Sequence, residues 1–85
     1  MSVVIYSTAV CPYCVRAKRL LEMKGVAYQD IRVDIEPQRR QEMIQRSQRY
    51  TVPQIWVGDV HVGGCDDLFA LESRGELDRL LSNAG

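Results

Sequence analysis

The sequence has no long run of apolar residues. Its longest aliphatic and aromatic stretch, Val3 to Tyr6, is four residues, far below the roughly 20 that a membrane helix needs. The first residues also lack the charged start and the long apolar stretch of a signal peptide. We therefore predict a cytoplasmic protein that does not bind a membrane.

The chain also lacks an excess of charge of either sign. Eleven Lys and Arg balance eleven Asp and Glu, whereas a protein that coats nucleic acid normally carries a basic excess. We therefore expect no nucleic-acid partner. The charges are unevenly divided, because residues 1–50 hold nine basic and five acidic side chains and residues 51–85 hold two and six. Such a split usually reflects solvated helix faces.

Cysteine is scarce. An odd count of three excludes the disulfide framework of a small secreted protein, which uses about four to eight cysteines. Two of the three lie close together, in Cys11-Pro12-Tyr13-Cys14. That spacing is typical of a redox pair or of half a metal site, and the rest of the chain must decide between them.

The length is sufficient for one domain. We predict a single domain over residues 1–85, since no linker, repeat or low-complexity tract divides the chain. A chain this short buries only about 60 to 65 % of the surface that its unfolded form exposes. A large partner must therefore bind on its surface, and we expect the protein to be a monomer.

The first 33 residues have the pattern of a βαβ unit. The β-branched and aromatic run Val3–Ser7 predicts a strand that is buried on both faces. Pro12 suits the first turn of a helix, and Gly25 after Lys24 is a stop signal for it. The alternating segment Val26–Val33 predicts a second strand, parallel to the first.

The rest of the chain predicts a helix, a hairpin and a last helical segment. Asp66 or Asp67 can cap that last segment, and a further turn follows Gly75. The predicted ranges are 36–48 for the helix, Gln54–Val57 and Val60–Val62 for the strands of the hairpin, and 66–81 for the last segment. The order βαβ-α-ββ-α predicts an α/β fold, a four-stranded mixed β-sheet covered by helices.

The position of Cys11 favours redox chemistry. It comes just before Pro12, so its sulfur lies at the N-terminus of the first helix, where unpaired N–H groups and the helix dipole stabilise an anion. Such settings lower a cysteine pKa from about 8.5 to ~3.5–7.5, which makes a nucleophilic thiolate at neutral pH. Cys14 follows one turn inward, so that Cys11 attacks and Cys14 resolves.

Zinc binding is the alternative for this motif, since His61 and Cys65 offer a third and a fourth ligand. However, structural zinc ligands usually come as paired motifs of short spacing. We interpret His61 as an exposed strand residue, and Cys65 as a small buried or half-buried side chain. No metal site is therefore predicted.

Two further segments suggest a binding site for a peptide. A proline before a buried strand is awkward unless it lies in a turn or at the strand's first residue. If Val52-Pro53 is cis, the backbone at Thr51-Val52 turns outward and can pair with an extended peptide. The segment from Gly63 to Asp67 supplies N–H groups for a carboxylate and Asp side chains for an amine.

Taken together, Cys11-Pro12-Tyr13-Cys14, residues 51–55 and residues 63–67 closely resemble the glutaredoxin family, and specifically its short bacterial dithiol type. The likeness covers nearly the whole chain, in the order and the spacing of the three segments. The resemblance implies a thioredoxin fold. It also implies an enzyme that reduces protein disulfides and glutathione mixed disulfides, with glutathione as the reducing co-substrate.

The resemblance also assigns roles to individual residues. Cys11 matches the family's nucleophile and Cys14 its resolving cysteine. The residues that it implies for glutathione binding are Tyr13, Thr51, Val52, Pro53, Gly64, Cys65, Asp66 and Arg40. Many members carry a lysine three residues before the first cysteine, where this chain has Thr8, and Arg40 or Arg49 can replace that positive charge.

Two other functions stay open at the level of sequence. Some relatives of glutaredoxins use the first cysteine and glutathione to bridge an iron–sulfur cluster between two subunits. Pro12 and Tyr13 make that less favourable, because the cluster-binding members tend to have smaller residues there. A thioredoxin-like reductase served by a flavoenzyme is the other alternative, although the Trp and the Gly-Pro of the thioredoxin motif are missing.

Overall fold

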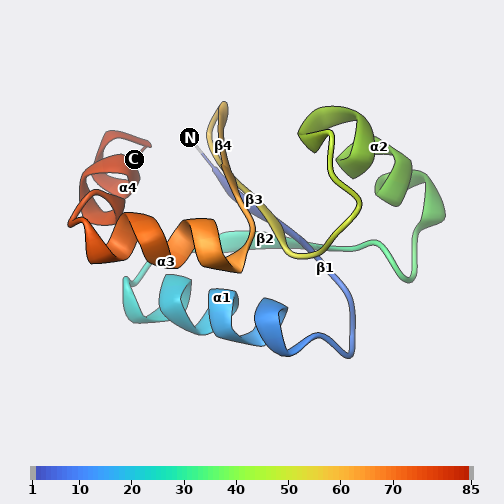
Figure 1. The fold of residues 1–85 in the computed structure, drawn as a ribbon, viewed down its shortest axis with the longest axis horizontal. Helices are drawn as coiled ribbons and strands as arrows, with labels where there is room; N and C mark the ends of the chain where they lie inside the picture. The colour runs from blue at the N-terminus through green and yellow to red at the C-terminus, as the bar shows by residue number, and fades with distance from the viewer. Residues whose placement is uncertain (1, 85) are drawn as a thin grey trace.

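In the computed structural model, which describes residues 2–84, four strands form one mixed sheet (Figure 1). The strand order is β2-β1-β3-β4; β1 pairs with β2 in parallel, and β3 is antiparallel to both β1 and β4. The strand bounds are Val3–Ser7 for β1, Tyr28–Arg32 for β2, Gln54–Val57 for β3 and Val60–Gly63 for β4. The predicted sheet is thereby confirmed.

Four helices cover the sheet. They are α1 (Pro12–Met23), α2 (Pro37–Ser47), α3 (Cys65–Ser73) and α4 (Leu77–Ala84). Figure 1 shows α1 and α3 side by side on one face of the sheet, with α4 following α3, and α2 on the other face. No helix within residues 2–84 combines the length and the apolar character needed to cross a membrane.

The alternation of side chains along the central strands builds a core on each face. Ile5 and Ile55 pack with α1, α3 and α4, whereas Tyr6 and Trp56 pack under Met43 of α2. Successive strand residues point to opposite faces, so every apolar residue of β1 and β3 finds a partner layer. The N-terminus of α1 is thus fixed against a rigid sheet.

Several boundaries differ from those predicted, most of them by one residue. The strand β2 begins at Tyr28, because the N–H of Val26 donates to the carbonyl of Leu21 at 3.3 Å and belongs to the end of α1. The helix α3 begins at Cys65 with Gly64 as its N-cap, so neither Asp66 nor Asp67 is the capping residue. The last turn predicted after Gly75 is a full helix, α4.

Candidate functional site

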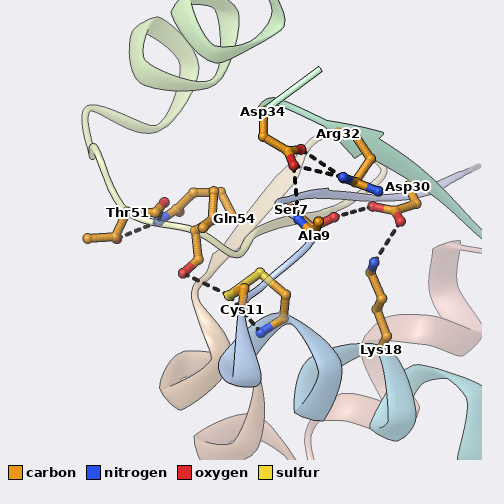
Figure 2. Close-up of a disulfide and its surroundings, with 11 residues drawn as sticks. Ser7, Ala9, Cys11, Lys18, Asp30, Arg32, Asp34, Thr51 and Gln54 are labelled. Atoms are coloured by element: carbon orange, nitrogen blue, oxygen red, sulfur yellow. Dashed lines mark hydrogen bonds and ion pairs between the residues drawn. A yellow bond between two sulfur atoms is a disulfide. The ribbon is translucent and has the colours of Figure 1, made fainter. Parts of the chain in front are cut away.

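The cysteine pair lies at the N-terminus of α1. Cys11 is the N-cap residue, and its Sγ accepts the N–H of Cys14 at 3.1 Å. The two sulfurs are joined in a disulfide with Cα atoms 5.2 Å apart (Figure 2). Cys11 is 9 % exposed and Cys14 1 %, so an external reactant reaches Cys11 first, as predicted.

The loop before Cys11 is anchored to the segment that follows β2. Asp34 accepts the N–H of Ala9 at 3.1 Å, and Arg32 donates to both oxygens of the same carboxylate, at 2.8 and 2.7 Å (Figure 2). The Arg32 guanidinium holds the pKa of Asp34 well below its usual range. The carboxylate therefore stays ionised in mild acid and keeps its hydrogen bond to the N–H of Ala9.

A second polar cluster ties α1 to the sheet. The hydroxyl of the buried Ser7 donates to one oxygen of Asp30, and Lys18 of α1 donates to the other at 2.6 Å (Figure 2). Three elements, β1, β2 and α1, meet at this carboxylate. The cluster fixes the helix that carries both cysteines.

A groove of about 380 Å³ lies beside Tyr13 of the cysteine motif. Its lining residues come from the cysteine motif, the loop before β3 and the start of α3. They are Tyr13, Arg49, Thr51, Val52, Pro53, Gly64, Cys65, Asp66 and Asp67. The Val52-Pro53 bond is cis, and the carbonyl oxygen of Val52 lies 3.9 Å from Cys11 Sγ. A residue that lines the groove, Val52, therefore lies beside the reactive sulfur.

Seven of the eight residues predicted to bind glutathione line this groove, and Arg40 does not. The guanidinium of Arg40 donates to the carbonyl of Tyr50 at 3.1 Å. Arg49 lines the groove instead and pairs with Asp67 at 2.9 Å. The sequence pointed to Arg49 only as a substitute, because Arg49 follows the predicted helix and the sequence does not show which element the segment after the helix contacts.

Asp67 organises the acidic end of the groove. Its Oδ2 accepts from Arg49 and, at 2.9 Å, from the N–H of Gly64. The hydrogen bond from Arg49 has the largest effect and lowers the pKa of Asp67, and the hydrogen bond from Gly64 also lowers it. The sequence suggested Asp67 as a cap or as a partner for an amine, and its spacing of three residues from Gly64 was the signal for this contact.

Cys65 is buried, as expected, with 4 % exposure. It is the one cysteine within residues 2–84 outside the disulfide. Burial, with a smaller effect from Asp66, raises the pKa of the Cys65 thiol, against the lowering effect of Arg16. At neutral pH the side chain is therefore a thiol, and not the thiolate that reacts.

This burial predicts a large difference in reactivity between the cysteines. In the reduced protein at pH 7, we expect iodoacetamide to modify Cys11 more than about tenfold faster than Cys65. Peptide mapping by mass spectrometry over time measures both rates. Cys65 should react readily once the protein is denatured, which is the control; equal rates in the folded protein would show that Cys65 is accessible and ionised.

His61 differs from the exposed strand residue that we expected. Its ring stacks on Trp56 with centroids 4.5 Å apart, and its Nε2 lies 2.8 Å from Gln54 Oε1. Among residues 2–84, no three His, Cys, Asp or Glu side chains are arranged to hold a metal ion. The described structure thus does not bring His61 and Cys65 together with the cysteine pair as zinc ligands.

A mixed four-stranded sheet with two cysteines at a helix N-terminus defines a thiol–disulfide oxidoreductase. A family model described as glutaredoxin matches residues 3–62. A curated glutaredoxin from Pseudomonas aeruginosa is 60 % identical over 94 % of this chain and 95 % of its own. The chain therefore belongs to the glutaredoxin family, as its sequence predicted.

Solved structures agree with this assignment. A glutaredoxin from Brucella melitensis has a TM-score of 0.87 at 52 % identity, covering 100 % of this chain and 92 % of its own. A buckwheat glutaredoxin in complex with glutathione has a TM-score of 0.91 at 32 % identity, covering 98 % and 78 %. The fold is the thioredoxin fold, and the protein is a glutathione-dependent thiol–disulfide oxidoreductase.

Proposed function

We propose that Cys11 removes glutathione from mixed disulfides bound in the groove, and that Cys14 joins in when the substrate is a protein disulfide. The observation that carries the proposal is the 3.9 Å approach of the Val52 carbonyl to Cys11 Sγ. The backbone of Val52, which lines the groove, thereby lies beside the outer sulfur. An extended peptide paired with this backbone has its own cysteine beside Cys11.

The first reaction needs only Cys11. Its thiolate attacks the glutathione sulfur of a mixed disulfide, which forms a Cys11–glutathione disulfide and releases the other partner as a thiolate. The thiolate of a second glutathione then attacks the glutathione sulfur bound to Cys11. Oxidised glutathione leaves with both sulfurs, and Cys11 returns as a thiolate stabilised by the N–H of Cys14.

Reduction of a protein disulfide uses both cysteines. Cys11 attacks one sulfur and forms a mixed disulfide with the protein, and the other sulfur of the protein leaves as a thiolate. Cys14 then attacks Cys11, which releases the reduced protein and leaves the Cys11–Cys14 disulfide seen in the structure. Two glutathione molecules restore the pair. Glutaredoxin potentials of about −200 to −230 mV make that exchange nearly reversible against the cytosolic pool.

The charges of the groove suit glutathione, which has two carboxylates and one amine. The first N–H groups of α3, at Cys65 and Asp66, lie at the positive end of that helix, where a carboxylate binds favourably. The carboxylate of Asp66 suits the amine of the γ-glutamyl end. Arg49, which also lines the groove, suits the glycyl carboxylate.

A kinetic assay of the wild-type protein and the Arg49→Gln variant tests the proposal. We expect saturable, glutathione-dependent reduction of a small glutathione mixed disulfide by the wild type. In the variant, the KM for that substrate should rise about threefold to tenfold with little change in kcat. The exposed contact of Arg49 with the substrate is equally strong in the bound state and in the transition state, so its loss weakens binding without slowing the bound substrate.

The matched control is Arg74→Gln. Arg74 pairs with Glu76 at 2.8 Å and does not line the groove, so its loss should leave the KM unchanged. A wild type without glutathione-dependent turnover would defeat the proposed function. An equal rise of KM in both arginine variants would show a general effect of charge and would contradict the role of Arg49.

We also propose the setting in which this reaction takes place. The partners are disulfide-containing or glutathionylated proteins, and the protein acts as a cytoplasmic monomer, since the groove is formed within one chain. No step uses a metal ion. A visible absorption band in protein purified without oxygen would contradict that last point and favour a cluster-binding function.

A further inference from the structure

Gln54, the first residue of β3, is a polar side chain that is fully buried, with 0 % exposure. Its Nε2 donates to the carbonyl oxygen of Thr51 at 3.1 Å and to the Thr51 hydroxyl at 3.3 Å, and its Oε1 lies 2.8 Å from His61 Nε2. A buried amide is costly unless it is hydrogen-bonded. The hydrogen bonds of its side chain thus connect Thr51, which lines the groove, with His61 of β4.

The two ends of this amide determine the state of His61. The nitrogen of Gln54 faces two oxygens of Thr51, so its oxygen faces His61 and accepts a hydrogen bond from the Nε2–H of that ring. His61 Nε2 therefore carries the hydrogen. Figure 2 shows the Gln54 side chain joined to Thr51 above the Cys11 disulfide. Gln54 thus links a half-buried histidine to the loop that lines the groove.

His61 is itself held in place by its neighbours. Its ring stacks on Trp56, and the guanidinium of Arg46 lies 4.3 Å from the centroid of the same indole. Burial lowers the pKa of His61, as do Arg49 and Arg46, against the raising effect of Asp67. The neutral imidazole is therefore a fixed donor to Gln54 at neutral pH.

The contact with Gln54 determines how the loop is presented to a ligand. The carbonyl of Thr51 points inward to Gln54, while the carbonyl of the next residue, Val52, faces Cys11 Sγ at 3.9 Å. We propose that Gln54, which is held by His61, is a positioning residue for glutathione. Gln54 fixes Thr51, so that the backbone of Val52 stays aligned beside Cys11. This inference rests on the proposed function.

The variant Gln54→Met tests the inference, because methionine has a similar length and no hydrogen-bonding amide. We expect the KM for a glutathione mixed disulfide to rise about tenfold, as the loop loses its two bonds to the side chain. The rate of alkylation of Cys11 by iodoacetamide, which has no glutathione group, should change by less than about twofold. His61→Phe, which keeps the stacking on Trp56 but loses the donor, should raise the KM by a smaller factor.

The control is a variant that loses stability without a change in the groove. Leu81→Ala removes a buried side chain of α4 that does not line the groove, and we expect a lower melting temperature with an unchanged KM. An unchanged KM in Gln54→Met would overturn the inference. So would a rise in KM together with a fall in the alkylation rate, if Leu81→Ala shows the same two changes. A wild type that does not use glutathione would instead overturn the proposed function, and this inference with it.

Discussion

Serine in place of Cys11 is expected to abolish both reactions, with a fall in turnover of about a thousandfold or more, because a hydroxyl does not supply the attacking thiolate. Serine in place of Cys14 should have an unequal effect. It should keep the removal of glutathione from a mixed disulfide, which needs only Cys11, and lose the reduction of protein disulfides. Turnover of a small mixed disulfide and of a disulfide-bonded protein, measured side by side, checks both expectations.

The structure explains why the two cysteines are not interchangeable. Cys11 is the N-cap, whose sulfur receives the N–H of Cys14, and Cys14 is nearly inaccessible inside the first turn of α1. Retained activity in Cys11→Ser would therefore refute the assignment of the nucleophile. Loss of both reactions in Cys14→Ser would show that Cys14 does more than resolve the intermediate.

The second large effect is expected at Gly63. Its φ is +114°, a backbone conformation that other residues rarely adopt, and an added Cβ would lie 2.3 Å from Asp67 Oδ2 and 2.7 Å from its Cγ. Gly63→Ala must therefore displace Asp67 from Arg49 and from the N–H of Gly64. We expect the free energy of unfolding to fall by about 2–3 kcal/mol, and the KM for a glutathione substrate to rise.

Gly25→Ala is the matched control. Gly25 also has a positive φ, +72°, but an added Cβ would meet nothing within 4 Å. Its replacement should cost only the conformational strain, about 1 kcal/mol, without a change in KM. Denaturant unfolding and steady-state kinetics measure both quantities. Equal losses of stability in the two variants would show that the crowding at Asp67 is relieved without cost.

The elements that the sequence predicted well are those with local signals. The strand Val3–Ser7 is apolar or aromatic from Val3 to Tyr6, and the start of α1 is marked by Pro12. The start of α3 was predicted less well. A carboxylate at either Asp66 or Asp67 is typical of a cap, and the folded backbone decides that Asp67 instead accepts the N–H of Gly64 from inside the helix.

The candidate site was partly predictable for the same reason. The cysteine motif, Pro53 and the Gly64–Asp66 segment are short motifs with chemistry of their own. The contacts that hold them are not local: Asp34 binds Ala9, Arg49 binds Asp67, and His61 binds Gln54 across a hairpin. Such pairs depend on how separate elements meet in space, which a single sequence does not reveal.

In the proposed mechanism, the position of Cys14 one helical turn from Cys11 makes two reactions compete for the same intermediate. Once Cys11 is bound to a protein, attack by Cys14 is unimolecular and proceeds at an effective molarity set by one helical turn. Attack by glutathione on the same intermediate is bimolecular and speeds up with its concentration. In that mechanism a high concentration of glutathione therefore favours the one-cysteine route, and a low concentration favours the two-cysteine route.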